Sequence, residues 1–122
     1  MNARARRNAD RSSAKVAIVG AGRVGATLAY TLIVERLAGE VVLLDVDRDR
    51  ARGEAMDLQH SLPFSVPTAV RAGDYGACRD SDVVVITAGA AQGPGQTRLS
   101  LADRNAEIYK DIVPKIVEEA AR

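Results

Sequence analysis

The chain contains few cysteine, histidine and aromatic residues. Its 122 residues include one cysteine, one histidine and no tryptophan, and aromatic residues make up 3%. A single cysteine excludes an internal disulfide, and Cys78 has neither a CxxC partner nor a nearby histidine, so we expect a small, partly buried thiol and no metal site. With a formal net charge of +1, the chain also lacks the basic surface that nucleic-acid binding requires, and we expect no nucleic-acid partner.

The N-terminal segment lacks a long apolar run. Residues 1–14, MNARARRNADRSSA, hold four arginines and one aspartate. Such a segment is neither a secretory signal nor a membrane span. An acid-poor leader rich in Arg and Ser is also typical of transit peptides, but no amphipathic face emerges, which favours a disordered basic tail. We therefore expect a cytoplasmic protein with no membrane partner.

From Lys15 onward, short apolar runs alternate with helical patterns. The runs are KVAIVG (15–20), EVVLLD (40–45), TAVRAG (68–73) and DVVVITAG (82–89). Strands that are apolar on both faces and alternate with helices predict a parallel sheet covered on both sides. The length fits one small domain, so we expect one α/β, doubly wound unit over residues 15–122.

Three segments have helical spacing. Residues 21–39 are expected to form a helix that ends at Gly39, and residues 47–60 a half-exposed helix. In the last helix, residues 99–121, Pro114 is expected to introduce a kink. At helical spacing, five apolar residues and one asparagine share one face of this helix: Leu101, Asn105, Ile108, Ile112, Ile116 and Ala120.

Gly20, Gly22 and Gly25 form the motif GAGRVG between the first strand and the first helix. In this context the first glycine permits a tight turn, the second lets backbone approach a pyrophosphate, and the third packs helix on strand. The helix N-terminus adds free N–H groups for phosphates. The motif therefore predicts a Rossmann-type nucleotide site, although glycines at this spacing also occur as plain turns.

Asp45 stands at the end of the second strand, twenty-five residues after the first glycine. A carboxylate there accepts hydrogen bonds from both hydroxyls of an adenosine ribose and repels a 2′-phosphate, which predicts NAD rather than NADP. Arg48 or Arg50 would partly offset that repulsion. The alternative is that Asp45 only caps the helix beginning near Arg48.

The stretch GAAQGPGQTR, residues 89–98, is too rich in glycine for a helix or strand interior. It connects the fourth strand to the last helix, where α/β proteins bind ligands. We therefore expect a mobile loop that delivers one charge, the guanidinium of Arg98.

These segments together resemble the N-terminal part of the L-lactate and malate dehydrogenases, NAD-dependent enzymes of 2-hydroxy acids. The resemblance rests on GAGRVGATLAY, LLDVDRDRARGEAMDLQH, DVVVITAGAAQGPGQTR and LADRNAEIYKDIVPKI, and covers nearly everything from Lys15. It implies a partial NAD-binding Rossmann domain over residues 15–122, with about four strands in the order 3-2-1-4. Residues 89–98 would be the lid loop that folds over the substrate.

The resemblance also implies roles for two lid residues. Arg98 matches the arginine that polarises the carbonyl of the 2-oxo acid, where it would stabilise developing alkoxide charge. Gln92 matches the position that recognises the substrate's side group. The methyl group of pyruvate needs no countercharge, whereas the second carboxylate of oxaloacetate does, so glutamine favours lactate dehydrogenase over malate dehydrogenase.

Further cofactor contacts follow from the resemblance alone: Val24, Arg50, Tyr75, Gly89 and Ala90. Tyr75 would equally suit a rim aromatic, and Arg50 a solvated charge. Ala91 departs from the larger, often polar residue that the family places beside the specificity glutamine.

The family's proton-transfer pair of histidine and aspartate, and the arginine that binds the substrate carboxylate, have no match here. The one histidine, His60, matches a position outside the catalytic pair, and we expect a helix-end or packing role for it. We therefore expect the N-terminal portion of a lactate dehydrogenase, inactive alone. The alternatives are a malate dehydrogenase portion or a stand-alone nucleotide-binding module without catalysis.

The resemblance implies a homotetramer for the complete enzyme, acting on a small 2-oxo or 2-hydroxy acid. In the strand order 3-2-1-4, the fourth strand would lie at an edge with apolar residues on both faces. Such edges invite pairing. We therefore expect the isolated chain to dimerise or aggregate.

Overall fold

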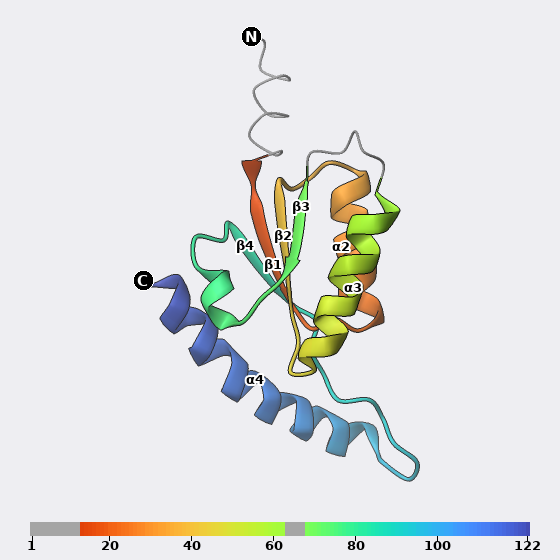
Figure 1. Ribbon diagram of the computed structural model, residues 1–122. Coiled ribbons are helices and arrows are strands. Elements are labelled where there is room, and N and C mark those ends of the chain that lie inside the picture. The colour runs from red at the N-terminus through yellow and green to blue at the C-terminus, as the bar shows by residue number, and fades with distance from the viewer. Residues whose placement is uncertain (1–12, 63–67) are drawn as a thin grey trace.

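A four-stranded parallel sheet forms the centre of the chain (Figure 1). The computed structural model describes residues 13–62 and 68–122, so most of the expected basic tail lies outside the described residues. The strands are β1 (Lys15–Val19), β2 (Glu40–Leu44), β3 (Ala69–Ala72) and β4 (Val83–Ile86). Their order is β3-β2-β1-β4 and each neighbouring pair is parallel, which confirms the predicted topology.

Helices cover both faces of this sheet (Figure 1). Helices α2 (Arg23–Val34) and α3 (Arg48–Ser61) lie on one face, and the 3-10 helix η1 (Tyr75–Cys78) and α4 (Arg98–Ala120) on the other. Alternate residues of β1 and β2 enter the two cores, because successive side chains of a strand point to opposite faces. Val16, Ile18, Val41 and Leu43 pack against α2 and α3, and Ala17, Val19, Val42 and Leu44 against η1 and α4.

Strand β4 lies at one edge of the sheet. Within residues 13–62 and 68–122 it pairs with β1 only, through the register Val16 to Val83 and Val19 to Ile86. The Val83 side chain is 50% exposed, and the other residues of β4 are partly buried. The edge position agrees with the prediction from strand order.

Helix α2 is shorter than expected, because it ends at Val34 rather than Gly39. Arg36 adopts a left-handed conformation with φ of 54°, and its N–H donates to Ile33 O at 3.0 Å. The N–H of Leu37 donates to Leu32 O at 2.8 Å. These two bonds form a Schellman turn, which usually places glycine at the left-handed position, so the sequence carried no stop signal there.

Helix η1 was not expected from the sequence. It follows β3 and presents Cys78 to the core between the sheet and α4, where the side chain is 1% exposed. This burial confirms the expected structural thiol and raises the pKa of Cys78, because an apolar environment disfavours the thiolate.

Helix α4 runs without a break through Pro114, and the kink there stays a prediction. On its sheet-facing side Ile112 and Ile116 are buried, Leu101, Asn105 and Ile108 are partly buried, and Ala120 is exposed. An ion pair of 3.0 Å between Arg79 and Glu119 joins the chain after η1 to the end of α4. In the described part of the chain, no helix combines the length and apolarity needed to cross a membrane.

Candidate functional site

A cavity of about 530 Å³ opens where the carboxyl ends of the strands meet α4. Its volume lies within the range of small-molecule sites in proteins. Six of the predicted cofactor residues line it: Gly20, Gly22, Asp45, Arg50, Tyr75 and Gly89. The structure thus gathers residues from the ends of β1, β2, β3 and β4 around one space.

The three glycines of the GAGRVG turn face different surroundings. Gly20 has φ of +116°, and a Cβ there would lie 2.6 Å from the backbone nitrogen of Ala88. A Cβ on Gly25 would lie 1.8 Å from the carbonyl oxygen of Gly20, so the start of α2 contacts the end of β1 directly. A Cβ on Gly22 would meet nothing within 4 Å. Packing therefore requires the outer two glycines, whereas the middle one borders the open cavity.

Helix α2 begins immediately after this turn without a side-chain cap. Gly22 is the N-cap residue, and the first turn contains no acidic residue. The first N–H groups of a helix have no intrahelical partner, and the helix dipole places partial positive charge there. This end of α2 therefore favours an anionic group such as a phosphate.

Asp45 joins the end of β2 to the glycine turn. Its Oδ2 accepts a hydrogen bond from the Ala21 N–H at 2.8 Å, and its Oδ1 accepts one from the Asp47 N–H at 2.9 Å. The idea that Asp45 merely caps the following helix is wrong, because the N-cap of α3 is Asp47, whose Oδ1 accepts from the Arg50 N–H at 3.1 Å. Each carboxylate oxygen keeps a further lone pair for hydroxyl donors.

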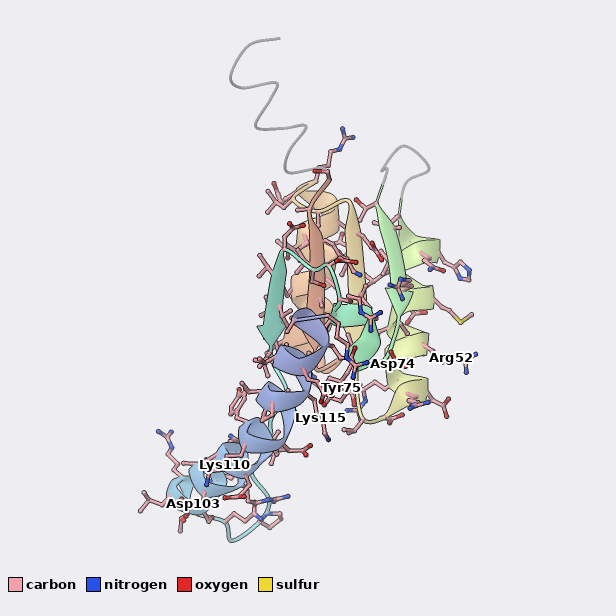
Figure 2. All side chains as sticks on the ribbon, turned by 90° about the vertical axis from the view of Figure 1, so that its left-hand side faces the viewer. Arg52, Asp74, Tyr75, Asp103, Lys110 and Lys115 are labelled. Carbon is pink, nitrogen blue, oxygen red and sulfur yellow. The ribbon has the colours of Figure 1, made fainter. Side chains whose placement is uncertain are left out.

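Tyr75 lines the cavity from the start of η1, opposite residues of α4. Lys115 Nζ lies 5.6 Å from the centroid of its ring, and Figure 2 shows the two side chains together. Lys115 also donates to Asp111 Oδ2 at 2.8 Å, and this hydrogen bond raises the pKa of Lys115. The lysine therefore stays charged over the aromatic face, a favourable cation–π geometry.

Thr87, which sequence analysis missed, links β4 to the glycine turn. Its Oγ1 donates to the carbonyl oxygen of Gly20 at 3.0 Å. Because residues 20 and 87 are far apart in the chain, no local spacing reveals this contact. The rule that ligands bind at the carboxyl ends of parallel strands would have found most of the missed lining residues. These are Val19, Leu44, Val46, Gly73, Asp74, Thr87 and Ala88, with Ile108 and Ile112 added by α4, whereas Arg48, which also lines the cavity, was considered from the sequence as a charge near the cofactor.

The loop of residues 89–98 reaches the cavity only at its start. Gly89 lines the cavity, and the chain then extends away from the sheet before turning back into α4 (Figure 1). Gln92 is exposed, and Arg98, the first residue of α4, is also exposed. Neither residue lines the cavity.

Other predicted residues lie outside the cavity. The Val24 side chain is 69% exposed on α2, Gly25 is buried behind the turn, and Ala90 contacts α4. His60 is exposed in the last turn of α3, which is the helix-end position expected for it.

Comparison with known proteins identifies the family. Residues 14–122 match the model of the lactate/malate dehydrogenase NAD-binding domain. L-lactate dehydrogenase of Thermoanaerobacter sp. (strain X514) is 50% identical over 104 residues, covering 85% of this chain and 33% of the relative. The corresponding enzyme of Gloeobacter violaceus is 52% identical over 104 residues, covering 85% and 32%.

Solved structures agree with the sequence relatives. The minor L-lactate dehydrogenase from Enterococcus mundtii has a TM-score of 0.85 at 42% identity, covering 89% of this chain and 35% of that one. Malate dehydrogenase from Archaeoglobus fulgidus in complex with NADH has a TM-score of 0.80 at 47% identity, covering 88% and 37%. The chain spans about a third of the length of the curated relatives it matches. It belongs to the lactate/malate dehydrogenase family and contributes the family's NAD-binding domain.

Proposed function

We propose that this chain is the cofactor-binding portion of an NAD-dependent L-lactate dehydrogenase, which in the complete enzyme interconverts pyruvate with NADH and lactate with NAD. The observation that carries the proposal is the attachment of Asp45 to the glycine turn at the rim of one cavity. In this arrangement a ribose-binding carboxylate stands beside an uncapped helix N-terminus. In this proposal the domain comprises residues 15–122, with residues 89–98 as its lid loop.

The residues present fit the cofactor. Gly22 borders open space where backbone can approach a pyrophosphate, and the first turn of α2 supplies N–H donors. Asp45 would accept hydrogen bonds from the adenosine ribose, and Tyr75 would border the adenine. Bound NAD supplies the hydride chemistry of the complete enzyme. Gly20, Arg50 and Gly89 complete the proposed lining of the cofactor site, whereas the predicted contacts Val24, Gly25 and Ala90 lie outside the cavity.

Arg98 is proposed to polarise the carbonyl of the 2-oxo acid when the loop closes. It has no hydrogen-bond or ion-pair partner within residues 13–62 and 68–122 and stands at the first position of α4, where the helix dipole disfavours a cation. Local packing therefore gives no reason for an arginine there. Closure would bring its guanidinium to the substrate and exclude water.

Gln92 is proposed to recognise the side group of the substrate. Its neutral amide leaves a second substrate carboxylate without a countercharge, which favours pyruvate over oxaloacetate. Malate dehydrogenase remains the second candidate, because the Archaeoglobus fulgidus malate dehydrogenase is 47% identical over the region compared.

The chain by itself is proposed to be inactive and to associate. Reduction of a ketone needs a proton donor near the reacting oxygen, and His60 lies at the end of α3 rather than on the cavity. The exposed edge of β4 is proposed to pair with a second copy. A stand-alone nucleotide-binding module would share both properties.

Fluorescence titration of the purified 122-residue chain with NADH and with NADPH tests the proposal. We expect NADH to bind at least about tenfold more tightly, since the Asp45 carboxylate repels a 2′-phosphate. Equal affinity for the two cofactors, or no binding of NADH by a chain that unfolds cooperatively, would refute the proposed cofactor site.

A further inference from the structure

The start of the lid loop is held by one side chain of α4. The backbone N–H of Ala90 donates to Asn105 Oδ1 at 2.8 Å. A Cβ on Gly89 would lie 3.4 Å from the same oxygen, so both residues rest against Asn105. Gly89 in turn lines the cofactor cavity. The Asn105 amide thus holds the cavity wall just after its last bond to β1, which the Ala88 N–H donates to Val19 O at 3.0 Å.

The tip of the loop, residues 91–96, is bonded only to itself within the described chain. Gln96 N–H donates to Gly93 O at 3.2 Å, and Gly93 N–H donates to Gln96 Oε1 at 2.9 Å. Gly95 has φ of 77°, which together with Pro94 before it is typical of a type II turn. Gln92 Nε2 donates to Gln96 O at 2.9 Å. The tip is therefore a preassembled unit without hydrogen bonds to the sheet or to α4.

The far end of the tip is fixed to the same helix. Thr97 caps α4, because its Oγ1 accepts from the Ser100 N–H at 3.1 Å. Thr97 and Asn105 are eight residues apart, about 12 Å along a helix axis. The movable tip therefore lies between two attachments to one rigid element.

Asn105 is not explained by helix formation or by apolar packing. It lies on the otherwise apolar face of α4, between Leu101 and Ile108, and is only partly buried. Asparagine is a poor helix former, and leucine or alanine would suit that position better. Its oxygen instead accepts a hydrogen bond from the Ala90 N–H, which has no other hydrogen-bond partner among the described residues.

We propose that Asn105 is a positioning residue that anchors Gly89 and Ala90, so that the movable segment of the lid begins at Ala91. Its Oδ1 keeps Gly89 on the cofactor cavity while the preassembled tip, carrying Gln92, swings as a unit. This deepens the proposed function, on which it rests for what the loop closes over. The anchor itself is a property of the free chain.

Amide hydrogen exchange measured by NMR on the full 122-residue chain tests the anchor without any cofactor. In Asn105→Ala, exchange at Ala90 should accelerate about tenfold, because a partly buried hydrogen bond is lost. Exchange at Gly93 and Gln96 should stay unchanged, since their bonds lie within the tip. Asn105→Asp is the matched control, because its carboxylate still accepts the Ala90 N–H and should preserve slow exchange.

A second variant approaches the same contact from the loop. Gly89→Ala would place its Cβ at ordinary van der Waals distance, 3.4 Å, from Asn105 Oδ1, so we expect exchange at Ala90 to stay slow with Asn105 intact. NADH affinity should fall several-fold in Asn105→Ala and be retained in Asn105→Asp. Unchanged exchange at Ala90 in Asn105→Ala, or equal acceleration throughout residues 89–96, would overturn the anchor. A wild-type chain that fails to bind NADH while Ala90 responds as expected would refute the proposed function and leave the anchor standing.

Discussion

Asp45 Oδ2 accepts a hydrogen bond from the backbone N–H of Ala21 at 2.8 Å, across twenty-four positions of sequence. The end of β2 is thereby attached to the glycine turn between β1 and α2. One carboxylate therefore serves two purposes, because it fixes the turn and also presents free lone pairs at the cavity. Loss of Asp45 should affect stability and cofactor selection together.

Asp45→Asn should weaken NADH binding by about ten- to a hundredfold and reduce the preference over NADPH, because the charge and one acceptor are lost. The free energy of unfolding should fall by about 1–3 kcal/mol, since a hydrogen-bonded N–H loses its charged partner. Titration of both cofactors and denaturant unfolding measure the two effects.

Asp47→Ala is the control for Asp45. It removes the N-cap of α3 and should cost about 1 kcal/mol. The ratio of NADH to NADPH affinity should not change, because Asp47 does not line the cavity. A ratio that shifts equally in both variants would show that selectivity does not depend on the Asp45 carboxylate.

Two alanine substitutions separate packing from binding in the glycine turn. In Gly25→Ala the new Cβ would lie 1.8 Å from Gly20 O, so the backbone must shift, and we expect destabilisation by about 3 kcal/mol or more. In Gly22→Ala the Cβ meets open space, so stability should change by less than about 1 kcal/mol.

The same pair should differ in cofactor binding. Gly22→Ala should bind NADH at least about tenfold more weakly despite its normal fold, because the methyl group blocks the backbone approach to the pyrophosphate. Unfolding curves and NADH titrations of both variants provide the measurement. Normal NADH affinity in Gly22→Ala would place the pyrophosphate elsewhere.

The buried thiol of Cys78 predicts a dependence of stability on alkaline pH. Burial raises the pKa of the folded-state thiol above its ordinary value of 9.0. A group with a raised folded-state pKa contributes fully below the unfolded pKa, and the contribution is lost as pH rises towards the folded pKa. The free energy of unfolding should therefore fall as pH increases above about 9.

Cys78→Ala separates this thiol from the tyrosines and lysines that titrate in the same range. The variant is expected to be less stable at neutral pH and to show a shallower decline above pH 9, measured by urea unfolding at several pH values. Identical slopes for the two chains would mean that the thiol does not control the alkaline loss.

The sequence was sufficient to predict those elements that a local residue pattern specifies. The spacing of Gly20, Gly22 and Gly25 specifies a strand, a turn and a helix, and strands that are apolar on both faces specify a covered parallel sheet. Contacts between distant segments could not be read this way. Thr87 meets Gly20 and Asn105 meets Ala90 only after the sheet and α4 are assembled.

Local signals also failed at the end of α2. Arg36 occupies the left-handed position of the Schellman turn, where glycine is the usual signal, so the prediction continued to the next glycine at residue 39. The sequence likewise gave no indication of whether Gln92 and Arg98 lie at the cavity or away from it. That arrangement depends on how the whole loop lies relative to the sheet, because the bonds at Gln96 join residues of the tip only to one another.

Substrate preference can be tested by joining the chain to the remaining part of a close lactate dehydrogenase relative. The completed enzyme should prefer pyruvate, and Gln92→Arg should shift kcat/KM towards oxaloacetate by about tenfold or more, because the guanidinium pairs with the second carboxylate. Gln92 is exposed and its replacement removes only the exposed bond from Nε2 to Gln96 O, so the free energy of unfolding should change by less than about 0.5 kcal/mol. A completed enzyme that prefers oxaloacetate with Gln92 in place would support the malate reading.

The exposed edge of β4 predicts self-association of the 122-residue chain. Val83 is 50% exposed there, and Val117 on α4 is 60% exposed. On α4, the Lys115 side chain lies over the Tyr75 ring of η1. Glu119 forms an ion pair with Arg79, directly after η1, so both side chains point towards η1. Val117 lies about 200° around the helix from either residue and so faces away from η1.

Two copies joined at these edges would form an antiparallel junction, because a two-fold axis perpendicular to the sheet reverses strand direction. Val83→Lys should prevent this dimer, because a lysine on an edge strand opposes pairing. The free energy of unfolding should change by less than about 0.5 kcal/mol, because the position is exposed. Light scattering over a dilution series should show a dimer or larger species for the wild type and a monomer for the variant. A wild-type chain that stays monomeric at tens of micromolar and unfolds cooperatively would show instead that the four-stranded domain is stable alone and that the β4 edge does not drive association.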